Sequence, residues 1–244
     1  MYQNYIFDLY GTLVDIHTEE GTASVWEKAA MYVSAQGAAY SGQELRERYV
    51  SLIQEEEEAL LKKLKKKYPE ITVREVEIDL DRVFAALYKE KGVKATKQTV
   101  KNAMLAFRAI TMEKLHLFPG AAELLQNLKD AGKKVYLLSN AQTSFTAPEM
   151  QLLGIDGLFD DIFFSSDLQV KKPSRYFFEE LFKKHNLKKE ESVMVGNDRW
   201  SDVQGALDFG IKAIYLHTEQ SSYFEGTLPE GCVQAADLYE VMKL

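Results

Sequence analysis

An aspartate stands directly after the first apolar run of this chain, where a carboxylate is well placed to do chemistry. The run Tyr5–Phe7 is typical of a buried strand, and Asp8 follows at its end. Gly11 then breaks the regular backbone, and Thr12 offers a hydroxyl. Open α/β sheets bind ligands outside the carboxyl ends of their parallel strands, so Asp8 is a candidate nucleophile. The alternative is that Asp8 only caps a turn.

Further residues with suitable chemistry follow later apolar runs. Ser139 and Asn140 come after the run that ends at Leu138, and their hydroxyl and amide are suited to holding an anionic oxygen. Lys172 offers a cation that offsets negative charge developing on that oxygen. Taken singly, Ser139 and Asn140 also fit a turn, and Lys172 fits a surface lysine. The prediction depends on their joint placement, because parallel strands end at the same edge of a sheet.

Asp198 and Asp202 form a pair of carboxylates at the start of a predicted helix. They are four positions apart, so both face the same point. Together with Asp8 they would repel one another unless a cation lay between them. Hard oxygen ligands without a nearby His or Cys favour Mg²⁺ over zinc, so we expect a Mg²⁺ site here. The alternative role of Asp198 is the N-cap of the helix.

The elements that position these residues alternate between strand and helix from residue 115 onward. This alternation predicts an α/β fold in which helices cover both faces of a parallel sheet. The first strand, at residues 4–8, joins the same sheet, so we expect one core made of residues 1–16 and 114–244. The further strands are expected at residues 133–138, 162–164, 192–195 and 213–216.

Residues 17–113 have a different pattern and are expected to form an insertion. Their hydrophobic residues follow helical spacing, and no segment reads as a convincing strand. Four helices suggest a small bundle. Arg108, on the last of them, is a candidate for contacting an anionic tail of a substrate when the insertion closes; the alternative is a solvated or ion-paired arginine. The helices are expected at residues 25–33, 45–64, 76–87 and 100–110.

Composition and charge argue against several classes of protein. Of the 244 residues, 46% are hydrophobic and 27% are charged, which is typical of a soluble globular protein. The net charge of −7 argues against a nucleic-acid binder held by phosphate contacts. The single cysteine, Cys232, excludes an internal disulfide and a cysteine-rich zinc site. We read neither a signal peptide nor a membrane span, and expect a cytoplasmic protein; no oligomeric state is indicated.

Four stretches of the chain together resemble the motifs of the haloacid dehalogenase superfamily of hydrolases. The resemblance covers the whole chain and implies a Rossmann-like, three-layer core with an all-α cap inserted after the first strand. Most members are phosphatases that act on small phosphorylated metabolites through a phospho-aspartate. The stretches are Asp-Leu-Tyr-Gly-Thr-Leu at 8–13, Leu-Leu-Ser-Asn at 137–140, Lys-Pro at 172–173, and Gly-Asn-Asp-Arg-Trp-Ser-Asp from 196, leading into Gly205 and Ala206.

The resemblance also implies roles for individual residues. Asp8 would be the nucleophile, Ser139 the phosphate-binding hydroxyl and Lys172 the lysine of the site. Mg²⁺ would be bound by Asp8 with Asp198 or Asp202. Thr12 would secure the loop or contact the phosphoryl group, and Asn140 would help to bind the substrate.

Tyr10 departs from the pattern of the phosphatases, which usually carry a second aspartate two residues after the nucleophile. That aspartate protonates the leaving oxygen and then activates water. The backbone carbonyl of Tyr10 still offers a metal contact, but a phenol with a pKa near ~10 is a poor base at neutral pH. Losing a general acid/base typically costs roughly 10²–10⁴ in rate, so acyl or aryl phosphates, with good leaving groups, would suffer least.

Tyr10 also leaves two alternatives to a phosphatase. Tyrosine at this place resembles the 2-haloacid dehalogenases, in which the aspartate attacks carbon and displaces halide without a metal. The pair of Asp198 and Asp202 weighs against this, as does Phe178, which stands where those dehalogenases have a tyrosine. The second alternative is a weakly active protein that binds phosphorylated metabolites. We expect a Mg²⁺-dependent phosphatase.

Overall fold

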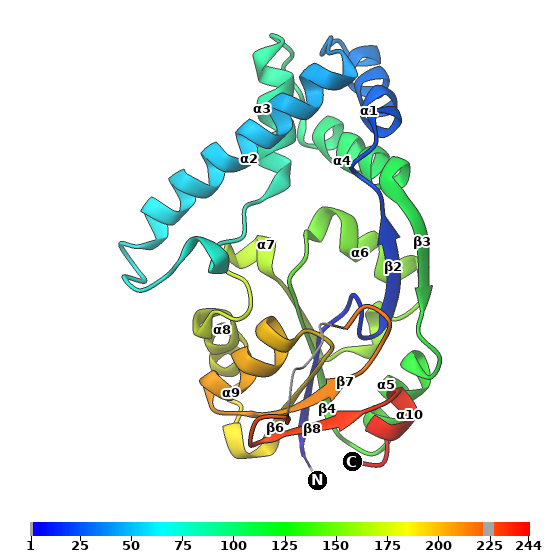
Figure 1. Ribbon diagram of the computed structural model, residues 1–244, viewed down its shortest axis with the longest axis vertical. Helices are drawn as coiled ribbons and strands as arrows, with labels where there is room; N and C mark the ends of the chain where they lie inside the picture. The colour runs from blue at the N-terminus through cyan, green and yellow to red at the C-terminus, as the bar shows by residue number, and fades with distance from the viewer. Residues whose placement is uncertain (1, 222–226) are drawn as a thin grey trace.

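The computed structural model describes residues 2–221 and 227–244 and contains a six-stranded sheet at the base of the molecule (Figure 1). All neighbouring strands are parallel, in the order β5-β4-β1-β6-β7-β8. Phe7 of the central strand β1 pairs with Leu137 on one side and Val195 on the other, so the carboxyl ends of three strands lie level. The strands are β1 (Asn4–Phe7), β4 (Lys134–Ser139), β5 (Asp161–Phe164), β6 (Ser192–Gly196), β7 (Lys212–Leu216) and β8 (Cys232–Ala235).

Helices cover both faces of this sheet, because successive side chains of a strand point to opposite faces. Phe7 belongs to a buried cluster with Leu125 of α5, whereas Ile6 belongs to a second cluster with Phe177 of α8. The predicted three-layer α/β fold is therefore confirmed. One face carries α5 (Ala121–Asp130), α6 (Thr143–Leu152) and α10 (Leu238–Val241); the other carries α8 (Arg175–His185) and α9 (Gly205–Phe209), and the short α7 (Ser165–Leu168) follows β5.

The predicted insertion contains four α-helices, which we call the helical segment (residues 23–111). Its interior is aromatic: the ring of Phe107 lies 5.3 Å from that of Trp26, 5.6 Å from Tyr49 and 5.7 Å from Phe84. Such contacts add to the stability gained by burying the rings. The helices are α1 (Ala23–Ala35), α2 (Gly42–Leu64), α3 (Leu80–Glu90) and α4 (Lys97–Thr111), with a short 3₁₀ turn, η1 (Val73–Glu75), before α3.

A two-stranded antiparallel ribbon connects the core to the helical segment (Figure 1). It consists of β2 (Val14–Thr18) and β3 (Met112–Leu117). Our expectation that residues 17–113 lack strands was therefore wrong at both ends. Apolar and polar residues alternate only over short stretches of the ribbon, where Ile16 and Leu117 pack against the core cluster that contains Val14. Polar pairs add to these contacts: Asp15 accepts from Lys114 and lies 3.1 Å from Nε2 of His116.

Other element boundaries also differ from the expectation. Helix α6 begins at Thr143 and contains Pro148 in its interior. Strand β8 and helix α10 were not expected at all: both are four residues long, and β8 has no buried apolar run, since only its last residue is buried. The helix predicted at Asp198 and Asp202 starts at Arg199 as a π-helical turn, η4 (Arg199–Gln204), that continues into α9. Two further 3₁₀ turns are η2 (Asp156–Leu158) and η3 (Lys189–Glu191).

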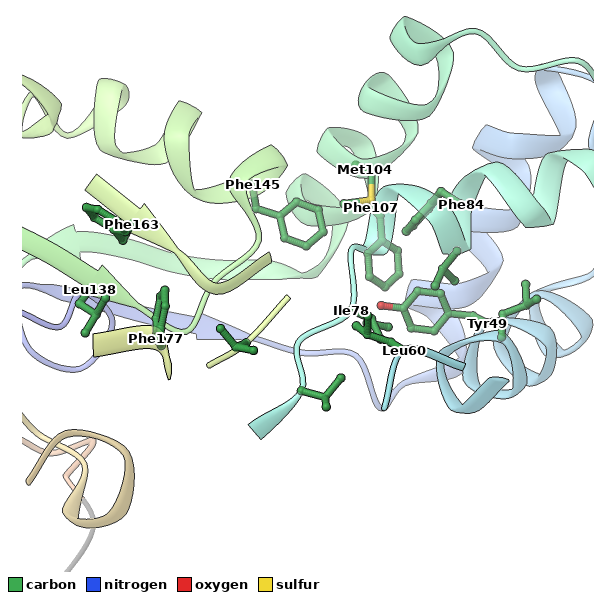
Figure 2. Close-up of a cluster of buried hydrophobic side chains, with 14 of the residues drawn as sticks. Tyr49, Leu60, Ile78, Phe84, Met104, Phe107, Leu138, Phe145, Phe163 and Phe177 are labelled. Carbon is green, nitrogen blue, oxygen red and sulfur yellow. The ribbon is translucent and has the colours of Figure 1, made fainter. Parts of the chain in front are cut away.

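Phe145 of α6 connects the buried side chains of the core with those of the helical segment. Figure 2 shows its ring between Phe163 of β5 and Phe107 of α4, and all three belong to one hydrophobic cluster. The core and the helical segment therefore share an apolar contact beside the ribbon. Within the described ranges, no helix has both the length and the apolar character needed to cross a bilayer.

Candidate active site

The carboxyl edge of the sheet brings the predicted strand-end residues together. The backbone N–H of Asp8 donates to the carbonyl of Val195 at 2.9 Å, so the turn after β1 remains attached to β6. Ser139 is the last residue of β4, and Gly196 is the last residue of β6. The residues beyond these three strands therefore surround the same edge, as parallel pairing requires.

Lys172 lies at the centre of this edge and bridges two carboxylates. Its Nζ donates to Oδ1 of Asp8 and to Oδ1 of Asp202, at 2.7 Å in both cases. The lysine side chain is 1% exposed, so the ammonium has no access to bulk water. Burial opposes its charge, but Asp202 and Asp8 outweigh that effect and raise the pKa of Lys172. Burial, together with the charge of Asp8, raises the pKa of Asp202 even though Lys172 opposes it.

Asn140 holds the main chain of Lys172 rather than presenting its amide freely. Its Nδ2 donates to the carbonyl of Lys172 at 3.0 Å, and its Oδ1 accepts from the N–H of Lys172 at 2.8 Å. This paired contact fixes the base of the lysine side chain. Ser139 differs, because its buried Oγ has no hydrogen-bond partner in the part of the chain that the structure describes. A buried hydroxyl without a partner is costly, and an anionic oxygen of a ligand would satisfy it.

The loop after β6 places Asp198 and Asp202 in different roles. Oδ1 of Asp198 accepts from the N–H groups of Trp200 and Ser201, at 2.9 and 2.6 Å, so it caps η4 as our alternative interpretation had it. Asp202 accepts from the N–H of Asp198 at 2.9 Å and turns its other oxygen to Lys172. A Cβ on Gly196 would lie 2.3 Å from Oδ2 of Asp202, so this carboxylate packs directly against the strand end.

The loop after β1 is held against the loop after β6. Oγ1 of Thr12 lies 3.3 Å from Oδ2 of Asp8 and 3.1 Å from Oδ1 of Asn197. Gly11 has a φ of +81°, and a Cβ at this position would lie 2.4 Å from Nδ2 of Asn197. Glycine is required here both for the left-handed backbone and for the close approach of the two loops.

Tyr10 points its hydroxyl to helix α6. The hydroxyl donates to Oε2 of Glu149 and lies 3.0 Å from Oγ1 of Thr146. Burial, reinforced by the charge of Glu149, raises the pKa of Tyr10. The phenol is therefore a weaker acid than free tyrosine.

Arg108 reaches Glu149 from the helical segment. Its Nε donates to Oε1 at 2.6 Å and its Nη2 to Oε2 at 3.2 Å, the two-pronged geometry in which arginine binds a carboxylate most strongly. The guanidinium also lies over the rings of Tyr10 and Phe145, 5.6 and 5.3 Å from their centres. The structure thus shows the ion-paired alternative that we considered for Arg108.

A cavity of about 460 Å³ opens between the helical segment and the core. Tyr10 and Asn140 contribute to its floor from the core, and Tyr49 and Arg108 contribute from the helical segment. A larger cavity of about 690 Å³ lies beside β3 and α10, and its lining includes none of the strand-end residues described above. The smaller cavity is therefore the candidate substrate pocket. Its other described lining residues are Ile16, Thr18, Glu20, Ile53, Glu57, Glu77, Ile78, Leu80, Ala141, Gln142, Phe145 and Thr146.

Sequence reasoning missed two residues that shape this site. Glu149 lies in the interior of α6, where a glutamate is an ordinary helix former without a signature of function. Asn197 stands inside the stretch from residue 196 without an assigned role, whereas the structure places its amide against Gly11 and Thr12. No local spacing encodes these contacts, because Glu149 lies 139 positions from Tyr10 and Asn197 lies 185 positions from Thr12.

The family model of haloacid dehalogenase-like hydrolases matches residues 2–210. The chain belongs to this family. The resemblance read from the motifs is therefore confirmed, and the chain is an enzyme of hydrolase type with phosphatases among its relatives.

Among curated members of the family, a glyceraldehyde 3-phosphate phosphatase from Methanothermobacter thermautotrophicus is 28% identical over 90% of this chain and 87% of its own. A phosphoglycolate phosphatase from Vibrio vulnificus is 30% identical over 45% of this chain, which spans half of that relative's length. The 2-haloacid dehalogenase from Pseudomonas syringae pv. Tomato DC3000 shares the fold, with a TM-score of 0.65 at 19% identity over 100% of this chain and 97% of that one.

Proposed function

We propose that this hydrolase is a Mg²⁺-dependent phosphatase of small phosphorylated metabolites, with Asp8 as its nucleophile. The observation that carries the proposal is the position of Lys172 between Asp8 and Asp202 at the carboxyl edge of the sheet. A cation beside a nucleophilic carboxylate suits the attack on a phosphoryl group, whose oxygens carry negative charge. The glyceraldehyde 3-phosphate phosphatase among the relatives supports the same reaction class.

The donor set supports Mg²⁺ with Asp198, rather than Asp202, as the second carboxylate. Asp202 already binds Lys172 and the backbone of Asp198, so both of its oxygens are used. Within residues 2–221 and 227–244, no three His, Cys, Asp or Glu side chains form a metal-binding group. Mg²⁺ does not need such a group, because it commonly keeps several waters and binds one or two carboxylates. Asp8, Asp198 and the carbonyl of Tyr10 would hold it there, and it would neutralise the charge of the phosphoryl oxygens.

The reaction would proceed in two displacements at phosphorus. In the first, a carboxylate oxygen of Asp8 forms a bond to phosphorus while the bond to the leaving oxygen breaks. Lys172 and the hydroxyl of Ser139 would stabilise the phosphoryl oxygens during this step. In the second, water attacks phosphorus, the bond to Asp8 breaks, and phosphate is released with the proton passing to solvent.

Tyr10 shapes which substrates this chemistry can use. Its hydroxyl is bound to Glu149 and its pKa is raised, so the phenol is not suited to protonating a leaving oxygen at neutral pH. Phosphates with leaving groups that depart without a proton would therefore react fastest. Acyl phosphates and aryl phosphates have this property.

Hydrolysis of a panel of phosphate esters and acyl phosphates, assayed with and without Mg²⁺, tests the proposal. The control is Asp8→Asn, which keeps the size of the side chain and removes the nucleophile. We expect phosphate release that depends on Mg²⁺ and disappears in the control. Release that persists at the same rate in Asp8→Asn would overturn the proposal, and so would no release from any compound of the panel.

The dehalogenase alternative receives its support from Tyr10 and is tested separately. Phe178, six positions after Lys172, is fully buried and stacks on Phe209 with ring centres 5.3 Å apart, so it faces the core rather than the pocket. This placement weighs against the alternative. Halide release from 2-haloacids in the presence of a chelator would establish it, and the absence of release would remove it.

A further inference from the structure

We propose that Glu149 determines substrate specificity. By pairing with Arg108 and Tyr10, it compensates the only positive charge among the described residues that line the pocket. The pocket then selects phosphate esters that carry no second anionic group. This inference rests on the proposed phosphatase function and names its substrate class. Glu149 acts through Arg108, so it is a positioning residue rather than a catalytic one.

The Arg108–Glu149 pair is built as a buried, geometrically fixed contact. Two nitrogens of Arg108 bind the two oxygens of Glu149, at 2.6 and 3.2 Å. The side chains of Arg108 and Glu149 are 15% and 8% exposed, so water competes little for either partner. A two-pronged pair in such surroundings is held far more firmly than a surface ion pair. A substrate carboxylate would therefore meet a guanidinium whose charge Glu149 already compensates.

Tyr10 and Phe145 add further restraints on the same guanidinium and its partner. The hydroxyl of Tyr10 donates to the oxygen of Glu149 that also accepts from Nη2 of Arg108. The rings of Tyr10 and Phe145 lie against the guanidinium on the core side, and Figure 2 places Phe145 at the junction between the core and the helical segment. Arg108 therefore functions as a link across this junction and is not free to follow a ligand.

The remaining charges on the pocket wall are negative. Arg108 is the one Lys, Arg or His side chain among the described residues that line the pocket, whereas Glu20, Glu57 and Glu77 line it as carboxylates. Glu77 has a partial counterion in Lys171, whose Nζ lies 3.9 Å from its Oε2. Burial raises the pKa of Glu20 and of Glu77, which indicates that these carboxylates lie in poorly hydrated surroundings.

A second anionic group on the substrate would therefore meet like charges without a compensating cation. Placing like charges opposite each other is a common way to reject a ligand that fits by shape. Hydroxyl, carbonyl and amide groups of a substrate carry no such penalty. The expected substrate is a phosphate whose leaving group carries no second anionic group.

Two probes of equal size separate charge from shape: phosphoglycolate, which carries a carboxylate, and its amide. Binding of both to Asp8→Asn protein is measured by calorimetry, and kcat/KM for both is measured with the unmodified enzyme. We expect the amide to be preferred by at least about tenfold in both measurements. In Glu149→Gln, which keeps the side chain size but frees the charge of Arg108, the preference should shift by about tenfold or more toward the carboxylate.

Two control variants complete the test. Adding Arg108→Gln to Glu149→Gln should abolish the shift, because the freed cation is then gone. Glu179→Gln removes a carboxylate whose Oε1 lies 2.8 Å from Nη2 of Arg175 on the exposed face of α8. This variant should leave the preference for the amide unchanged. A purely structural role of Glu149 would change kcat/KM for both probes equally.

The outcomes distinguish this inference from the proposed function. If neither probe is hydrolysed but the amide binds more tightly, the phosphatase proposal is in question while the specificity inference stands. Equal binding of the two probes, or tighter binding of phosphoglycolate to the Asp8→Asn protein, overturns the inference. Failure of both probes to bind also overturns it.

Discussion

The ammonium of Lys172 lies 2.7 Å from Oδ1 of Asp8, although 164 positions of sequence separate the two residues. The same ammonium lies 2.7 Å from Oδ1 of Asp202, so one buried cation compensates two carboxylates. The three groups depend on one another, because removing the cation would leave two like charges facing each other in the protein interior. The contact therefore contributes to the stability of the core as well as to the orientation of Asp8.

Replacing Lys172→Met should impair both stability and turnover. The change leaves Asp8 and Asp202 without their shared counterion, and breaking a buried pair in this way costs roughly 3–5 kcal/mol. Urea unfolding measures the loss of stability, and phosphate release measures the loss of turnover, which we expect to exceed about 100-fold. Lys171→Met is the matched control, because its ammonium lies 3.9 Å from Glu77 and is partly exposed. A Lys172→Met protein as stable as this control would contradict the assigned role.

The strand-end part of the site was predictable because it follows from topology. Once the apolar runs ending at Phe7, Leu138 and Val195 are identified as parallel strands, their carboxyl ends must lie at one edge. Asp8 and Asp202, which follow two of these strands, must then lie close to this edge however the side chains pack. Lys172 could be added only through the joint pattern, since a lysine in a loop has no local signature of burial.

The contacts of Tyr10, Arg108 and Asn140 were not predictable from local patterns. Glu149 meets Tyr10 only because α6 packs beside the loop after β1, and it meets Arg108 only because the ribbon brings α4 onto α6. Asn140 was expected to hold an anionic oxygen, yet both groups of its amide bind the main chain of Lys172. Side-chain partners at such separations depend on tertiary packing, which periodicity does not encode.

Asp198→Asn should weaken activation by Mg²⁺ while leaving the fold intact. The amide oxygen of asparagine still accepts from Trp200 and Ser201, so the cap of η4 is retained. The lost carboxylate charge should raise the Mg²⁺ concentration for half-maximal activity at least about tenfold. Activity titrated with Mg²⁺ after treatment with a chelator measures this shift. Asp208→Asn, in α9 and exposed, is the control; equal titration curves for the two variants would argue against a metal at Asp198.

Gly196→Ala should displace Asp202 from its position. The added Cβ would lie 2.3–2.5 Å from three atoms of the Asp202 side chain, which is anchored by Lys172 and by the N–H of Asp198. Overpacking of this kind costs roughly 1–3 kcal/mol. We expect lower thermal stability together with a drop in phosphatase activity. Gly157→Ala, where the new methyl group has no neighbour within 4 Å, should change neither quantity.

Tyr10→Asp should reveal how far the native side chain limits the chemistry. A carboxylate two positions after Asp8 provides the acid and base that the phenol does not, so the rate for alkyl phosphates should rise, by up to roughly 10²–10⁴. Rates for aryl phosphates should change much less. The comparison also separates an active phosphatase from a weakly active binding protein. A fall in turnover for alkyl phosphates would show that Tyr10 has a positive role in the reaction.

Asp160 provides a test of stability that is independent of the site. Its Oδ1 accepts from Nζ of Lys134 at 2.7 Å and its Oδ2 from the N–H of Val135 at 2.9 Å, at the amino end of β4. Burial opposes the charge, but Lys134 and the N–H of Val135 outweigh it and lower the pKa of Asp160 below its ordinary value of 3.8. A lowered pKa means that the contribution is complete above the unfolded-state pKa and is lost as the pH falls through the folded-state pKa.

Asp160→Asn should therefore destabilise the protein at pH 7, and the deficit should shrink as the pH falls below ~3.8 and through the still lower folded-state pKa, where the native aspartate also becomes protonated. The deficit at pH 7 should be about 1 kcal/mol, since Asp160 is only partly buried and its lysine partner is exposed. Urea unfolding of the native protein and the variant at several pH values gives the difference in their free energies of unfolding. The titration of all other groups affects both proteins alike and cancels in this difference. Phosphatase activity at pH 7 should be unchanged, because β4 separates Asp160 from Ser139 at its opposite end. A deficit that does not shrink at any pH below ~3.8 at which the protein still folds would show that the charge of Asp160 does not stabilise the fold.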